Sequence, residues 1–101
     1  LYEAHHGIVP VQAKQTKSLT YDIVGPVCES GDWLGRDRLL AVDEGDLLAI
    51  LSAGAYGFVM ASNYNTRPKP AEIMVDGKNA YVIRARENTQ DLFATESILP
   101  K

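Results

Sequence analysis

Residues 18–32 read SLTYDIVGPVCESGD. The first part of this stretch alternates with a period of two and is rich in β-forming residues, so it predicts a strand over 18–24. Gly25-Pro26 then breaks or bulges the strand, and residues 30–32 predict a turn. The stretch therefore places Cys28, the only cysteine of the chain, and its neighbour Glu29 on a loop at the end of a strand.

The rest of the chain also reads mainly as strands. The apolar run at 47–51 is typical of a strand buried on both faces, and residues 76–79 give the turn signal of a hairpin. Residues 33–42 show no clear periodicity, so we expect a loop with a bend there. The predicted strands are 7–11, 18–24, 47–51, 71–75 and 80–85.

Helical signals are short and few. Apolar residues at helical spacing predict one short helix within 53–61, and a second is predicted over 87–93, with Asn88 or Thr89 as its N-cap. Strands at this density in a chain of 101 residues suggest a sheet that closes on itself. We therefore expect an all-β fold, a small β-barrel with one or two short helices, and a single domain spanning 1–101.

Composition excludes several classes of function. The net charge is −3 and no dense basic cluster exists, which argues against nucleic-acid binding. No apolar run is long enough to span a bilayer, and the start lacks the pattern of a signal peptide. One cysteine permits no internal disulfide, which suits a reducing compartment and predicts a cytoplasmic protein. The absence of an initial methionine suggests that the chain begins inside a larger protein.

From the residues alone, two interpretations of Cys28 remain open. At the end of a strand its thiol could transfer a proton while Glu29 binds an ammonium group, or it could be a small buried hydrophobic residue. Residues 52–57, with Tyr56 among small residues, could hold an anion such as phosphate on backbone N–H groups, or could simply pack closely on a sheet. The adjacent pair His5-His6 has poor spacing for a metal, and we expect no metal site.

Four motifs in order resemble one known family. Residues 25–32, 44–46, 53–57 and 62–72 are similar to those of the C-terminal β-barrel of diaminopimelate decarboxylases, which are pyridoxal-phosphate-dependent enzymes of the alanine-racemase-like fold type. The resemblance runs from the first residue to about Leu92. It implies a larger, homodimeric protein whose TIM-like barrel, absent from this chain, carries the lysine that binds the cofactor.

The resemblance also implies roles for individual residues. Cys28 would protonate the α-carbon of the substrate after carbon dioxide leaves, and Glu29 would bind the distal amino-acid end of the substrate. Tyr56 would lie against both cofactor and substrate. Tyr2 matches the tyrosine that closes a substrate-binding Arg-Pro-x-x-Tyr motif. The full enzyme would convert meso-diaminopimelate to L-lysine and carbon dioxide.

Two alternatives remain beside this interpretation. A decarboxylase of the same fold could act on ornithine or another diamino acid, although relatives of that kind typically carry Cys-Asp where this chain has Cys28-Glu29. The chain could also be a non-catalytic barrel for dimerisation or binding. If the protein is a decarboxylase of either kind, this chain alone should be inactive, because it lacks the barrel with the cofactor lysine. Its internal lysines are expected in turns or loops: Lys14, Lys17, Lys69 and Lys78.

Overall fold

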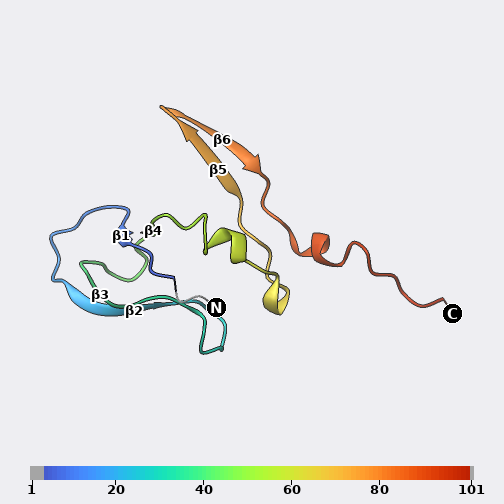
Figure 1. Cartoon of the computed structure of the whole chain (residues 1–101), viewed down its shortest axis with the longest axis horizontal. Helices are drawn as coiled ribbons and strands as arrows, with labels where there is room; N and C mark the ends of the chain where they lie inside the picture. The colour runs from blue at the N-terminus through green and yellow to red at the C-terminus, as the bar shows by residue number, and fades with distance from the viewer. Residues whose placement is uncertain (1–3, 101) are drawn as a thin grey trace. The chain divides into compact units, whose positions relative to one another are not determined.

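The computed structural model describes residues 4–100 (Figure 1). These residues divide into two compact units, one ending at Met60 and one beginning at Ala61. Regular structure in them is mostly strand, as expected. The elements are β1 (Ile8–Pro10), β2 (Leu19–Val24), β3 (Trp33–Leu40), β4 (Leu48–Ile50), η1 (Phe58–Met60), η2 (Tyr64–Thr66), β5 (Glu72–Asp76), β6 (Asn79–Arg84) and η3 (Thr89–Phe93), where η marks a 3₁₀ helix.

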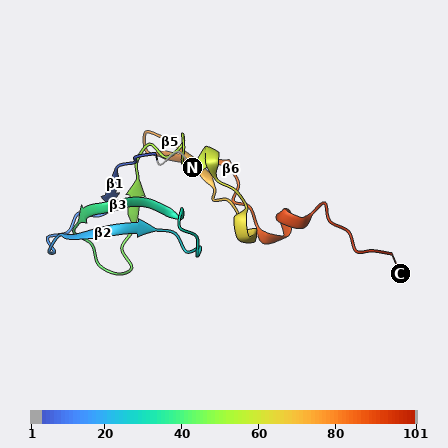
Figure 2. The same cartoon turned by 60° about the horizontal axis from the view of Figure 1, so that its bottom comes forward.

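The first unit is built on the antiparallel pair β2–β3, whose strands run side by side in Figure 2. The pairing runs from Leu19 opposite Leu40 to Val24 opposite Trp33, with two register shifts near the end of β2. The end of β2 and the start of β3 therefore lie opposite each other, and a loop connects them. This pairing fixes where the chain between Val24 and Trp33 leaves and re-enters the sheet.

A second antiparallel pair, β1–β4, lies against β3. Ile8 is opposite Ile50 in this pair, and Ile8 and Leu40 are the buried apolar residues of the described chain. Gly35 on β3 makes room for Ile8, because a Cβ at position 35 would lie only 2.7 Å from its Cδ1 atom. The Arg38 guanidinium donates a hydrogen bond of 2.7 Å to the His6 carbonyl and so ties β3 to the start of β1.

Residues 33–42 differ from the expectation of a bent loop, since most of them form the long strand β3. The irregularity that hides this strand is local. Asp37 has a left-handed backbone (φ 53°), and its N–H donates 3.0 Å to the Asp22 carboxylate on the neighbouring strand. Such a kink interrupts the alternation of side chains along a strand, so the sequence pattern reads as a loop.

The expected closed barrel is not formed by residues 4–100. Their strands make three separate two-stranded sheets, β1–β4, β2–β3 and β5–β6. A barrel needs every strand to pair along both of its edges, and in these sheets each strand pairs along one. The run at 47–51 is also less buried than expected: β4 forms there, but Leu47 and Leu51 are exposed.

The helix expected within 53–61 is reduced to the single turn η1. Ser52 (φ 54°) and Tyr56 (φ 60°) both have left-handed backbone conformations, which a right-handed helix cannot include. The helical spacing of apolar residues in this segment therefore does not become a helical face. None of the 3₁₀ helices in the described range has the length or the apolar character of a membrane span.

The second unit contains the predicted hairpin and the predicted short helix. β5 and β6 pair antiparallel with Ile73 opposite Val82, and Gly77 supplies the left-handed residue of the turn (φ 60°). Asn88 caps η3 through a capping box with Asp91. The cap satisfies backbone N–H groups that a short helix leaves without internal partners.

Glu87 fastens the segment between η2 and β5 in this unit. One oxygen of its carboxylate accepts hydrogen bonds from the Lys69 N–H (2.7 Å) and from the Asn63 side-chain amide (2.8 Å). These hydrogen bonds lower the pKa of Glu87 below its ordinary value of 4.5. The bond from the Lys69 N–H has the larger effect, and the bond from the Asn63 amide comes next. A carboxylate whose pKa falls on folding stabilises the fold above its unfolded pKa and loses that contribution as the pH drops through the folded value.

We expect Glu87→Gln to destabilise the second unit at neutral pH, because the amide oxygen keeps the acceptor geometry but lacks the charge. The loss should shrink as the pH falls from neutral to below the folded-state pKa of Glu87, because Glu87 itself then becomes protonated. Urea unfolding at both ends of that range measures it. Glu96→Gln, at an exposed position after η3, is the matched control; equal effects of the two variants at both pH values would contradict the assignment.

Candidate functional site

The loop between β2 and β3 is folded tightly by its own backbone. The Gly25 N–H donates 2.8 Å to the Asp32 carbonyl, which closes the loop at its base. Further along, the Glu29 N–H donates 2.9 Å to the Val27 carbonyl and the Asp32 N–H donates 3.0 Å to the Glu29 carbonyl. Cys28 is thus the central residue of a three-residue turn, and a second turn from Glu29 to Asp32 follows it directly.

The Asp32 side chain adds a bond across this loop. Its Oδ2 atom accepts a hydrogen bond of 2.7 Å from the Val27 N–H. Gly25 permits the approach, because a Cβ at position 25 would overlap the Asp32 carboxylate. The glycine that breaks strand β2 in the sequence is therefore also the residue that makes room for the loop-closing carboxylate.

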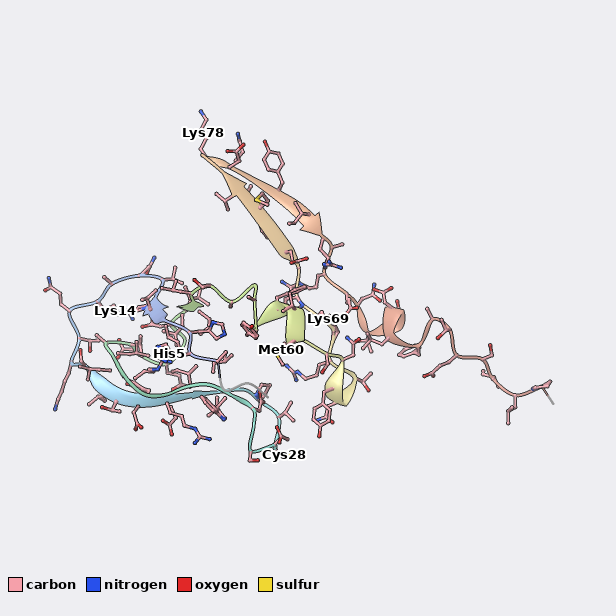
Figure 3. The ribbon with its side chains drawn as sticks, viewed as in Figure 1. His5, Lys14, Cys28, Met60, Lys69 and Lys78 are labelled. Carbon is pink, nitrogen blue, oxygen red and sulfur yellow. The ribbon has the colours of Figure 1, made fainter. Side chains whose placement is uncertain are left out.

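Cys28 is exposed and lies at the end of the loop that joins β2 to β3, as Figure 3 shows. In this chain it is therefore not the small buried hydrophobic residue of the alternative interpretation. Glu29 is exposed as well, and its Oε2 atom accepts 3.0 Å from the Gly31 N–H. The other oxygen of the Glu29 carboxylate has no protein partner among the described hydrogen bonds, so it is available to a cationic group.

An open hollow of about 390 Å³ borders the loop. Glu29 is among the residues that line it, and Cys28 is not. The Arg36 guanidinium stacks over the Trp33 ring at 4.4 Å from its centroid, an arrangement that holds both at the rim. The lining residues are Asp22, Val24, Gly25, Val27, Glu29, Ser30, Asp32, Trp33 and Arg36.

Sequence reasoning missed three of these residues. Asp32 was visible only as part of a turn, and nothing in the sequence shows that its side chain reaches back to Val27. Trp33 and Arg36 were hidden because their segment was taken for a loop. On a strand, residues three apart do not share a face, and here the bulged end of the β2–β3 pair brings these two side chains together.

Tyr56 lies elsewhere in the first unit, in the turn between β4 and η1. It is 58% exposed and does not line the hollow beside Glu29. Two N–H groups after it are already used, since Phe58 donates to the Ala53 carbonyl (2.6 Å) and Val59 to that of Gly54 (3.1 Å). Tyr2, the other tyrosine expected at the site, lies outside the described residues.

Lys14 and His6 of the first unit make contacts with residues that do not line the hollow. Lys14 contacts the carboxylates of Asp46 (2.7 Å) and Asp43 (3.2 Å), and the hydrogen bonds to Asp46 and then to Asp43 raise its pKa. His6 Nδ1 lies 3.2 Å from the Leu51 carbonyl. In residues 4–100, no lysine lines the hollow and no group of three or more His, Cys, Asp or Glu side chains could hold a metal ion.

Comparison with known proteins gives consistent matches. The family described as "Pyridoxal-dependent decarboxylase, C-terminal sheet domain" matches residues 1–54. Diaminopimelate decarboxylases of Vibrio cholerae and Pseudomonas aeruginosa are 56% and 54% identical over all 101 residues. The chain spans about a quarter of the length of these relatives, 24% in both cases.

Solved structures agree with these sequence relatives. The diaminopimelate decarboxylase of M. jannaschii in complex with L-lysine is 44% identical, with a TM-score of 0.87 over 98% of this chain and 23% of that one. The enzyme of Helicobacter pylori complexed with L-lysine is 42% identical, with a TM-score of 0.83 over 93% of this chain and 23% of that one. In both comparisons the similarity covers nearly all of this chain.

The left-handed backbone of Tyr56 gives a stability test. We expect Tyr56→Gly to be more stable than Tyr56→Ala by about 1 kcal/mol, because only glycine adopts φ near +60° without a Cβ clash. Urea unfolding of both variants measures the difference. The same pair at Tyr81, on strand β6, is the control and should show the opposite order; an alanine variant at position 56 as stable as the glycine variant would contradict the conformation.

Proposed function

The chain belongs to the family of C-terminal sheet domains of pyridoxal-dependent decarboxylases, and from this we propose that it is the C-terminal domain of a diaminopimelate decarboxylase. The whole protein would convert meso-diaminopimelate to L-lysine and carbon dioxide. The observation that carries the proposal is the 56% identity to a diaminopimelate decarboxylase across the entire chain. The tightly folded loop that presents Cys28 and Glu29 is the part of the domain best suited to this chemistry.

The remainder of the protein is part of the same proposal. Relatives about four times as long support a preceding TIM-like barrel domain that carries the cofactor lysine, and the family resemblance supports a cytoplasmic homodimer with active sites at the subunit interface. We also propose that the sheets of residues 1–101 complete a β-barrel in that protein. The hairpin supports this, because Ile73 and Val82 on one face and Met74 and Tyr81 on the other are all exposed, whereas sheets apolar on both faces are normally covered on both.

Pyridoxal phosphate fits this chain only in part. It needs an amine for its covalent attachment, and no lysine lines the hollow beside Glu29, so that amine would come from the preceding domain. The exposed phenol of Tyr56 would lie against the cofactor and the substrate. When bound, pyridoxal phosphate takes up the electron pair released as carbon dioxide leaves.

The residues of the β2–β3 loop would then complete the reaction. The Cys28 thiol would donate a proton to the α-carbon of the substrate, and its exposed position at the loop end lets solvent restore that proton. Glu29 keeps one oxygen on the Gly31 N–H, and its second oxygen would bind the ammonium at the distal end of the substrate. Tyr2 would add a substrate contact.

The family resemblance bears on the substrate, because relatives that act on ornithine typically carry aspartate where this chain has Glu29. Glu29 carries one methylene more than aspartate and reaches further from the loop, which supports diaminopimelate over ornithine. A decarboxylase for ornithine or another diamino acid is the nearest alternative. A barrel used only for dimerisation or binding is the second, and it would leave the exposed thiol of Cys28 without a chemical role.

Purified full-length protein tests the proposal. Its absorbance should show lysine-bound pyridoxal phosphate, and addition of meso-diaminopimelate should release lysine, with ornithine as the comparison substrate. Bound cofactor with turnover of ornithine alone would move the assignment to the other decarboxylase. Absence of a cofactor band would leave a non-catalytic barrel.

We expect Cys28→Ala in the full-length enzyme to lower turnover by about a hundredfold or more, the usual contribution of a positioned proton donor. Cofactor content, read from absorbance, should stay at the wild-type level. Cys28→Ser keeps the size of the side chain but is a far weaker acid, so it should be nearly as slow. Turnover at the wild-type rate in either variant would contradict the proton-donor role.

Substitution of Glu29 should act mainly on substrate binding. Glu29→Ala and Glu29→Gln should each raise KM for meso-diaminopimelate by about tenfold, the cost of losing one charged hydrogen bond. The glutamine variant is the sharper test because it retains an oxygen for the Gly31 N–H and loses only the charge. Steady-state kinetics with both substrates measures it, and unchanged KM together with unchanged substrate preference would contradict the role.

A further inference from the structure

We propose that Asp32 is the positioning residue of the β2–β3 loop, holding the backbone on both sides of Cys28 so that the thiol is delivered in one fixed place. The inference rests on the proposed function, because it assigns Asp32 a part in the same proton transfer. Neither the family resemblance nor the sequence motif had given Asp32 a role beyond a turn.

Asp32 contacts the loop at three points that bracket Cys28. Its carboxylate accepts from the N–H of Val27, the residue before Cys28 (2.7 Å). Its own N–H donates to the carbonyl of Glu29, the residue after Cys28 (3.0 Å), and its carbonyl accepts from the Gly25 N–H at the loop base (2.8 Å). One residue thereby fixes the base of the loop and both flanks of the thiol.

The Asp32 side chain supplies the hydrogen bond to the Val27 N–H, which a turn formed by backbone groups alone would lack. The two backbone bonds of Asp32 would survive its replacement by alanine, whereas the bond to Val27 would not. That bond joins residues five apart in the sequence, one on each side of Cys28, and it depends on the missing Cβ of Gly25. Gly25 and Asp32 therefore act as a pair, in which the glycine gives the carboxylate its place.

A second aspartate in the same unit shows what an ordinary turn aspartate does. The Asp46 carboxylate accepts 2.9 Å from the Asp43 N–H, three residues back, in the turn before β4. Its bond closes a turn with no cysteine or other nucleophile inside it. Asp46→Ala removes a hydrogen bond of the same kind, together with the Lys14 ion pair, at a place where nothing reactive is positioned, and it serves as the control.

A misplaced thiol is expected to slow proton transfer while leaving the rest of the site intact. Displacements near 1 Å at a reacting group cost about a hundredfold in rate. In the full-length enzyme with pyridoxal phosphate, we expect Asp32→Ala to lower kcat per bound cofactor by about ten- to a hundredfold. Asp32→Asn keeps an oxygen for the Val27 N–H, so its kcat should stay within about threefold of the wild-type value. The kcat of Asp46→Ala should stay within the same range.

Hydrogen–deuterium exchange supplies a readout that does not depend on activity. Without its acceptor the Val27 N–H should exchange faster, so the peptide covering residues 25–32 should exchange about tenfold faster in Asp32→Ala and at the wild-type rate in Asp32→Asn. Asp46→Ala should leave that peptide unchanged. Wild-type exchange and wild-type kcat in Asp32→Ala would overturn the proposal.

Gly25→Ala keeps the test valid if Asp32→Ala fails to fold or to bind cofactor. Its added Cβ should displace the Asp32 carboxylate and reproduce the slow turnover and the fast exchange. If Asp32→Ala is obtained, adding Gly25→Ala to it should cost less than about threefold more, since both changes break one contact. Wild-type behaviour of Gly25→Ala, or fully multiplicative losses, would overturn the pairing of the two residues.

The outcomes separate this inference from the proposed function. If the wild-type full-length protein binds no cofactor and decarboxylates no diamino acid, the proposed function fails. The exchange comparison still decides whether Asp32 holds the loop, because it needs neither cofactor nor substrate. If the wild type is an active decarboxylase and the Asp32 variants match it, the positioning role alone fails.

Discussion

The antiparallel pairing of β2 with β3 brings Val24 opposite Trp33, and the fold of the loop that carries Cys28 and Glu29 follows from that closure. Because the two strand ends face each other, the intervening chain must turn back within a few residues. Asp32 stabilises that turn with its backbone and its carboxylate, and Gly25 leaves the space that the carboxylate fills. Cys28 lies exposed at the end of this loop, and the backbones of its neighbours Val27 and Glu29 are both hydrogen-bonded to Asp32.

This arrangement gives a loop whose shape is set within the chain, and the proposed chemistry would be completed by the rest of the protein. The loop offers a thiol, a carboxylate with one oxygen available, and an adjoining hollow, but residues 4–100 place no lysine in that hollow. Such a division suits a domain that spans a quarter of its relatives. A rigid loop on a small sheet can be presented to a cofactor held by another domain without reorganising on arrival, which favours catalysis by prior positioning.

The sequence predicted the local features whose signals are short-range. Regular alternation located β2, the turn residues located the β5–β6 hairpin, and Asn88 was correctly named as one of two possible caps for η3. The sequence did not predict features that depend on the conformation of single backbone residues. The Asp37 bulge disguised β3 as a loop, and the left-handed residues Ser52 and Tyr56 prevented the helix that apolar spacing suggested.

The candidate site shows the same limit. Cys28 and Glu29 could be singled out by residue type, by position after a strand and by family resemblance. The bond from the Val27 N–H to Asp32 could not, because it depends on the path of the backbone through the loop. The closed barrel that the density of strands suggested is not formed by residues 4–100, since pairing between distant strands depends on partners that local patterns do not specify.

A crystal structure of the full-length protein with pyridoxal phosphate and L-lysine bound tests the central claim most directly. The account predicts the β2–β3 loop in the conformation described, with the Asp32 carboxylate on the Val27 N–H and the Cys28 thiol within about 4 Å of the α-carbon of the bound lysine. The Glu29 carboxylate should face the distal end of that lysine. A Cys28 thiol turned to bulk solvent, far from the cofactor of either subunit, would contradict the account.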